Sequence, residues 1–245
     1  MDTFFRAFLI LILYYFFLVA FIPIVLKTQF KAPRELVRKF QHIAYAASFA
    51  IYLYVFESWA YAVIAIIFFI ILAFFVLLIF EKTSYYTKLL VDRKKRGGEM
   101  KYSLIQAQAM FAILLYLFYY LLPNDNEIIA WIAVVSWGIG DALAALLGKR
   151  FGKRKHDGYN ADPKKTYVGS ISLNIAVLLI VFSLLALFSD VPWIASLIIA
   201  IIVSPLATVI EAYAKRGTDT TFLPIGIALM VYGLLFLFNI MGLTL

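Results

Sequence analysis

The sequence predicts an all-α membrane protein, a bundle of about eight transmembrane helices. Of its 245 residues, 64% are hydrophobic, against the roughly 45–50% apolar content of an average soluble domain. The mean hydropathy is +0.94. The apolar residues form runs long enough to cross a bilayer, which takes about 20 residues per helix. Only short loops remain between the runs, so we expect a single domain, 1–245.

Each apolar run that is bounded by charge, proline or glycine predicts one span. The predicted spans lie near residues 4–26, 40–56, 58–80, 102–122, 127–147, 169–188, 191–210 and 223–243. The first run is too long for the core of a signal peptide and has no small-residue cleavage site after it, so we interpret it as a membrane helix. The second run is the shortest and contains His42 and Ser48. If it is only partly embedded, seven full crossings remain.

The distribution of charge predicts the topology. Of the 22 Lys and Arg residues, all except Arg6 fall in four segments, 27–39, 81–101, 148–168 and 211–222. Eight spans place these segments on one side, and the positive-inside rule makes that side cytoplasmic, with both termini outside. We therefore expect any phosphate-binding site to face the cytoplasm.

Composition also excludes several kinds of site. The chain has no cysteine, which rules out disulfides, thiolate metal sites and thiol nucleophiles. The net charge of +8 does not point to nucleic acid, because the basic residues lie between hydrophobic spans rather than on a soluble surface. We expect their partners to be lipid headgroups and phosphates.

Asp141 is the most informative polar residue inside a predicted span. It lies about two helical turns, roughly 10 Å, before Gly148 at the cytoplasmic end. Small residues at every fourth position, Ser136, Gly140, Ala144 and Gly148, form a strip where another helix can approach closely. Asp141 is either neutralised by a lysine of the next loop or a ligand in a metal or phosphate site. We favour the ligand, because a buried carboxylate is unfavourable without a function.

The segment after Asp141 is rich in glycine and lysine. Glycines let backbone amides approach phosphate oxygens, lysines supply point charges, and Gly169 and Ser170 can present free amides at a helix start. The candidate residues are Gly140, Gly148, Lys149, Arg150, Gly152, Lys153, Lys165, Thr166, Gly169 and Ser170. An ordinary cytoplasmic loop explains the charges but not the glycines. A Walker loop is excluded, because Leu143 and Arg150 replace two of its defining residues.

Two further groups of polar residues are candidates. Arg38, Lys39 and His42 open the second span, and Arg38 and Lys39 are candidate phosphate contacts. His42 is suited to binding a phosphate or acting as a base, although a lone interfacial histidine is more often structural. Glu211 closes the seventh span and Asp219 follows it. With Asp141, these two acids would form an all-oxygen site suited to Mg²⁺. The structural alternative is a helix pair between Glu211 and Lys215, with Asp219 solvated.

Four segments in this order make the chain similar to the CTP-dependent polyprenol kinases. This family contains the dolichol and phytol kinases and is related to the phosphatidate cytidylyltransferases. The matching segments are 38–42, 140–153, 165–170 and the acids of 211–224, and the second is the longest and most specific. Two positions depart from the usual pattern, namely Val168, where many dolichol kinases have glutamate, and Thr220, where the family has asparagine.

The resemblance implies an enzyme that transfers the γ-phosphate of CTP to the hydroxyl of a long isoprenoid alcohol, with a divalent metal. It implies nucleotide binding by Asp141, Lys149, Arg150, Lys153, Lys165, Thr166, Gly169 and Ser170. Asp141 or His42 would accept the alcohol proton, and the isoprenoid tail would lie between apolar helices. The alternatives are a cytidylyltransferase that makes a CDP-lipid and, from a different class, a membrane transporter without nucleotide chemistry.

Overall fold

The computed structural model describes residues 2–83, 99–122, 126–156, 165–214 and 218–242. Over these residues the chain is helical, and its packing divides it into two compact units, residues 1–116 and 117–245. Each unit buries an apolar core of its own. The prediction of a single domain stays a prediction.

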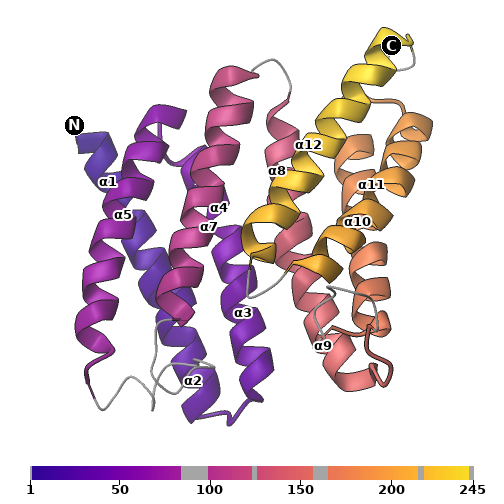
Figure 1. Ribbon diagram of the computed structural model, residues 1–245. Helices are drawn as coiled ribbons and strands as arrows, with labels where there is room; N and C mark the ends of the chain where they lie inside the picture. Colours follow the sequence, from indigo (N-terminus) through magenta and orange to yellow (C-terminus); the bar gives the residue numbers. More distant parts are fainter. Residues whose placement is uncertain (1, 84–98, 123–125, 157–164, 215–217, 243–245) are drawn as a thin grey trace. The chain divides into compact units, whose positions relative to one another are not determined.

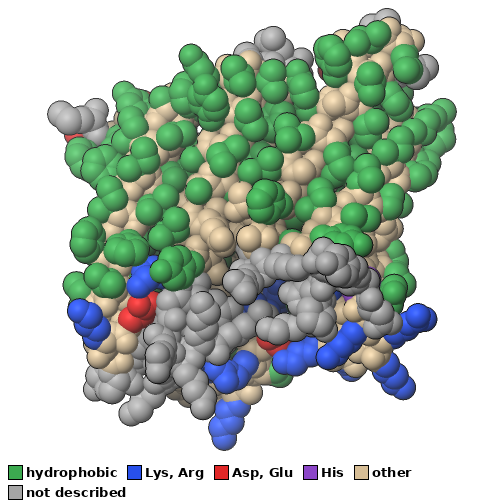
Figure 2. All heavy atoms as spheres, in the orientation of Figure 1, with side chains coloured by type: hydrophobic (Ala, Val, Ile, Leu, Met, Phe, Trp, Pro, Cys, Tyr) green, Lys and Arg blue, Asp and Glu red, His purple; other side chains and the backbone are tan. Residues whose placement is uncertain are grey.

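Seven described helices are long and apolar enough to cross a membrane, which confirms the all-α membrane fold. Their bounds are Asp2–Thr28, Trp59–Phe80, Lys101–Leu121, Glu127–Phe151, Tyr167–Phe188, Trp193–Tyr213 and Asp219–Ile240. Large apolar side chains are exposed along these helices; on α5 (Trp59–Phe80), for example, Phe68 and Phe75 are both more than half exposed. Figure 2 shows this hydrophobic surface, with Lys and Arg side chains gathered near the helix ends. An apolar exterior of this kind is suited to lipid.

The predicted second span is a broken helix. Residues 40–56 correspond to the end of α3 (Arg34–Ala47) and to the short α4 (Phe49–Tyr54), which are separated at Ser48. The Ser48 hydroxyl donates to the carbonyl of Tyr45 at 2.7 Å, a local bond that competes with regular helix. In the first unit, α3 packs beside α2 (Ile22–Thr28) and α4 beside α1 (Asp2–Tyr14). The segment therefore runs back along the first helix without being a continuous apolar span (Figure 1).

The second unit is organised around α10 (Tyr167–Phe188). This helix packs against α9 (Asp141–Phe151) and α11 (Trp193–Tyr213), while α12 (Asp219–Ile240) packs against α11 and α8 (Glu127–Val135) (Figure 1). A π-helical stretch, Ser136–Gly140, joins α8 to α9. It ends immediately before Asp141, and such stretches are frequent at functional sites.

Candidate functional site

A lysine and two acids from three helical segments meet in the second unit. Lys165 precedes α10, Glu211 lies near the end of α11, and Asp219 begins α12. The Lys165 ammonium lies 2.7 Å from Glu211 Oε1 and 3.7 Å from Asp219 Oδ2. It also donates a hydrogen bond to the main-chain carbonyl of Glu211. We call these three residues the acid–lysine cluster.

The acid–lysine cluster is largely withdrawn from solvent. The side chains of Lys165 and Glu211 are 16% and 6% exposed, and that of Asp219 is 20% exposed. In the described part of the chain, Glu211 Oε2 is buried and accepts no hydrogen bond. A buried carboxylate oxygen without a donor is unfavourable, so its presence calls for an additional cation or donor.

Asp141 belongs to the same neighbourhood. It is half-buried at the start of α9, and it and Asp219 both lie close enough to Glu211 to act on its charge. Asp141 therefore lies within electrostatic range of Glu211, whereas Lys165 directly contacts both Glu211 and Asp219. The alternative partner of Glu211, Lys215, lies outside the described residues.

The donor chemistry of the acids fits a hard divalent cation such as Mg²⁺, which prefers carboxylate oxygens. Glu211 Oε2 is the oxygen best placed to accept one, because Oε1 already faces Lys165. Among the described residues, however, no group of three or more His, Asp or Glu side chains is arranged closely enough to hold a metal ion. The Lys165 ammonium occupies the position between Glu211 and Asp219 that a cation would take.

The glycines around the cluster have a packing role. A Cβ added to Gly152 would lie 2.3 Å from the Gly148 carbonyl oxygen and 2.4 Å from Thr166 Oγ1, and one on Gly148 would lie 2.8 Å from Thr166 Oγ1. A Cβ on Gly169 would approach the Ala144 carbonyl oxygen to 2.9 Å. The predicted small-residue strip therefore faces α10 and lets the two helices approach closely. This packing explains the glycines without a phosphate.

The amides at the start of α10 are not free, contrary to the sequence prediction. Thr166 is the N-cap residue, and its hydroxyl accepts a hydrogen bond from the Gly169 amide at 3.2 Å. The Ser170 amide donates to the Thr166 carbonyl at 3.0 Å. Capping by a threonine side chain satisfies the donors that an uncapped helix would offer to an anion.

Three of the predicted basic residues lie at and just beyond the end of α9, next to the start of α10. Lys149, Arg150 and Lys153 are exposed at the end of α9 and just beyond it. Arg150 packs over the ring of Phe151, with the guanidinium carbon 5.1 Å from the ring centroid. Lysine and arginine side chains are the residues that most often bind phosphate groups in proteins.

The predicted residues of the second span belong to the first unit. Arg38 pairs with Glu35 of its own helix at 2.7 Å, Lys39 is buried, and His42 is half-buried. The pairing of Arg38 supplies a structural role that the sequence analysis did not assign. A phosphate contact by Arg38 or Lys39 and a catalytic role for His42 stay predictions.

Two polar arrangements were missed by sequence reasoning. His156 Nε2 lies 2.9 Å from Ser170 Oγ, and the His156 ring packs against Tyr167 at 4.4 Å between centroids. In the first unit, the hydroxyl groups of Tyr15 and Ser48 are 2.8 Å apart, and Gln108 bonds Tyr15 and Tyr52. The hydrogen-bonded partners are between 14 and 93 residues apart in the chain, so no local sequence motif predicts them.

Comparison of the chain with models of protein families, with curated proteins and with solved structures finds no match.

Proposed function

We propose that this membrane protein is a lipid-alcohol kinase that transfers the γ-phosphate of CTP to a long-chain isoprenoid alcohol. The acid–lysine cluster carries the proposal, because it joins Lys165, Glu211 and Asp219 beside Asp141 at the ends of membrane helices. Phosphoryl transfer requires chiefly positioning and neutralisation of phosphate charge. The motifs of residues 140–153 and 165–170, which resemble those of polyprenol kinases, support CTP as the phosphate donor.

Each group has a defined part in the proposed reaction. The alcohol oxygen forms a bond with the γ-phosphorus, the bond to the β,γ-bridging oxygen breaks, and CDP leaves. The alcohol proton passes to Asp141. Lys149, Lys153 and Lys165 neutralise the phosphates. A divalent metal at Asp141, Glu211 and Asp219 stays a prediction, because among the described residues these acids do not form a metal-binding group.

Labelled CTP provides the decisive test. We expect purified protein in liposomes containing geranylgeraniol to place a γ-phosphate label in the lipid and to leave a cytidine label in CDP. A cytidine label in a lipid product would instead indicate a cytidylyltransferase. If no nucleotide is consumed with any prenol, the kinase proposal is wrong and a transporter is favoured.

Replacing Asp141 by asparagine tests the assigned acid. We expect D141N to lose at least about 10²-fold in phosphate transfer, because it removes a charge that a metal or a proton needs. Asp190 is exposed at the opposite end of α10, so D190N is the matched control and should retain activity. Full activity of D141N in a protein that folds like wild type would refute the assignment.

A further inference from the structure

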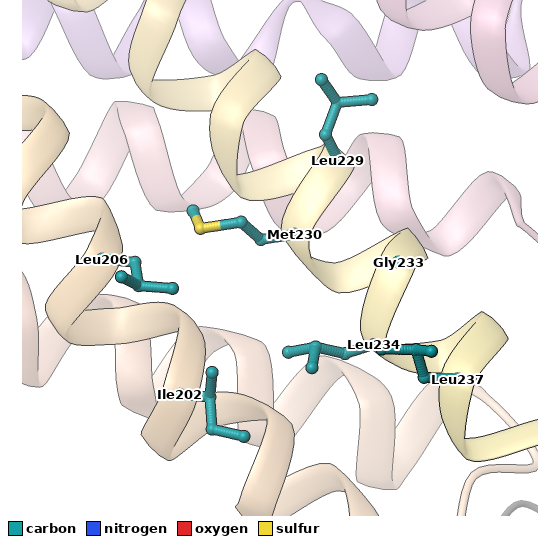
Figure 3. Close-up of a pocket in the computed structure, with 7 residues that line it drawn as sticks. All are labelled: Ile202, Leu206, Leu229, Met230, Gly233, Leu234 and Leu237. Atoms are coloured by element: carbon teal, nitrogen blue, oxygen red, sulfur yellow. The ribbon is translucent and has the colours of Figure 1, made fainter. Parts of the chain in front are cut away.

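An apolar groove lies between α11 and α12 in the second unit. Its volume is about 230 Å³, and Figure 3 shows side chains of the two helices facing one another across an open gap. The lining residues are Ile202, Leu206, Leu229, Met230, Gly233, Leu234 and Leu237. None of them carries a polar side chain, so the groove is suited to a hydrocarbon.

Gly233 opens the groove. A Cβ built on this residue would meet no heavy atom within 4 Å, whereas the glycines of the α9–α10 contact are tightly enclosed. Glycine on a membrane helix usually permits close helix packing. At Gly233 it leaves space instead, and the flanking Leu229 and Leu237 are about half exposed to the surroundings of the helix.

The groove lies on the two helices whose ends carry the acids of the cluster. Glu211 is near the end of α11 and Asp219 begins α12. At helical rise, Leu206 is roughly 8 Å along α11 from Glu211, and Gly233 is roughly 21 Å along α12 from Asp219. A chain in the groove would thus extend into the bilayer from a polar head held near Lys165.

We propose that this groove binds isoprene units of the lipid alcohol beyond the first and so presents its hydroxyl to the acid–lysine cluster. The assignment rests on the proposed kinase function and specifies where its substrate lies. Annular phospholipid is the rival occupant, since it covers any apolar surface in a membrane. The two occupants can be distinguished, because filling the groove raises the KM for long prenols only if the groove binds the substrate.

Filling the groove tests the proposal kinetically. Replacing Gly233 by leucine places a side chain in the open space and displaces the equivalent of about two methylene groups of substrate. We expect the KM for geranylgeraniol to rise roughly tenfold, while the KM for CTP and for a five-carbon prenol stays unchanged. V209F is the matched control, because Val209 is exposed on α11 and does not line the groove.

Photolabelling tests the occupant directly and does not require turnover. A geranylgeraniol analogue with a diazirine on its tail should label groove residues of α11 and α12 in liposomes, and free geranylgeraniol should compete while phospholipid should not. Labelling elsewhere, equal competition by phospholipid, or an unchanged KM in folded G233L would overturn the groove assignment. If labelling maps to the groove but no phosphate is transferred, the groove stands and the kinase proposal fails.

Discussion

Removing the charge of Lys165 is the most direct test of how the acid–lysine cluster is held. K165M keeps a long side chain but deletes the ammonium. The distances of 2.7 Å to Glu211 and 3.7 Å to Asp219 correspond to attractions of about 6 and about 4.5 kcal/mol at an effective dielectric constant of about 20. Desolvation of the charges offsets much of this. Because Glu211 would stay buried without its partner, we expect the free energy of unfolding to fall by about 3–5 kcal/mol.

The double variant K165M/E211L separates stability from function. Replacing both charges by apolar groups of similar size should return stability to near the wild-type value, since buried ion pairs are seldom better than apolar contacts. Phosphate transfer should remain lost, because Lys165 is assigned to neutralising the phosphates. The matched control is K101M, which breaks the 2.8 Å pair of Lys101 with Glu81 in the first unit. K101M should lose stability and retain activity per folded molecule.

Unfolding in mixed micelles of detergent and SDS, followed by tryptophan fluorescence, gives the free energies. If K165M lowers the free energy of unfolding by less than about 1 kcal/mol, the ion pair contributes no more than a solvent-exposed one. That result would refute the conclusion that the acid–lysine cluster is enclosed. An active K165M/E211L would refute its proposed role in catalysis while leaving the structural account intact.

Two further predictions use paired variants and the same unfolding assay. G152A should lower the free energy of unfolding by about 1–3 kcal/mol, because its Cβ would overlap the Gly148 carbonyl and Thr166. The Cβ of G233A meets open space, so this variant should be neutral or stabilised by up to about 1 kcal/mol. Equal effects in the two variants would contradict the packing role of Gly152. Q108L should lower the free energy of unfolding by about 1–2 kcal/mol, because the buried hydroxyls of Tyr15 and Tyr52 lose their hydrogen-bond partner. Gln106 is part-exposed on the same helix, so Q106L should change stability little. Equal stability of the two variants would contradict the role of the buried network.

The long helices could be predicted because hydrophobicity is a property of consecutive residues. Span 127–147, for example, was predicted from its apolar run, and the structure extends it only to Phe151. The break at Ser48 could not be foreseen with the same ease. It depends on a hydroxyl that bonds its own helix at Tyr45 and a side chain 33 residues away, Tyr15. The hydrophobicity of a helix can be read from consecutive residues, whereas a hydrogen bond between residues 33 positions apart cannot.

The sequence predicted which residues belong to the candidate site better than it predicted which of them contact one another. Asp141 was predicted because a polar residue inside a membrane helix is unfavourable without a function, and Glu211 and Asp219 because with Asp141 they would form an oxygen site for Mg²⁺. In the structure, Lys165 contacts Glu211 and Asp219. The partner of Glu211 is Lys165, 46 residues away, rather than a neighbour on its own helix. A pairing between helices depends on how they pack, which one sequence does not specify.

The glycines illustrate why a motif needs a structure before a role is assigned. Gly148, Gly152 and Gly169 looked suited to phosphate because glycine lets a backbone come close to a ligand. In the structure the same property lets one helix come close to another, around Thr166. The two roles are compatible, since close packing of α9 on α10 places the basic end of α9 beside Lys165. The lysines and acids therefore carry the chemical argument, and the glycines determine where those charges meet.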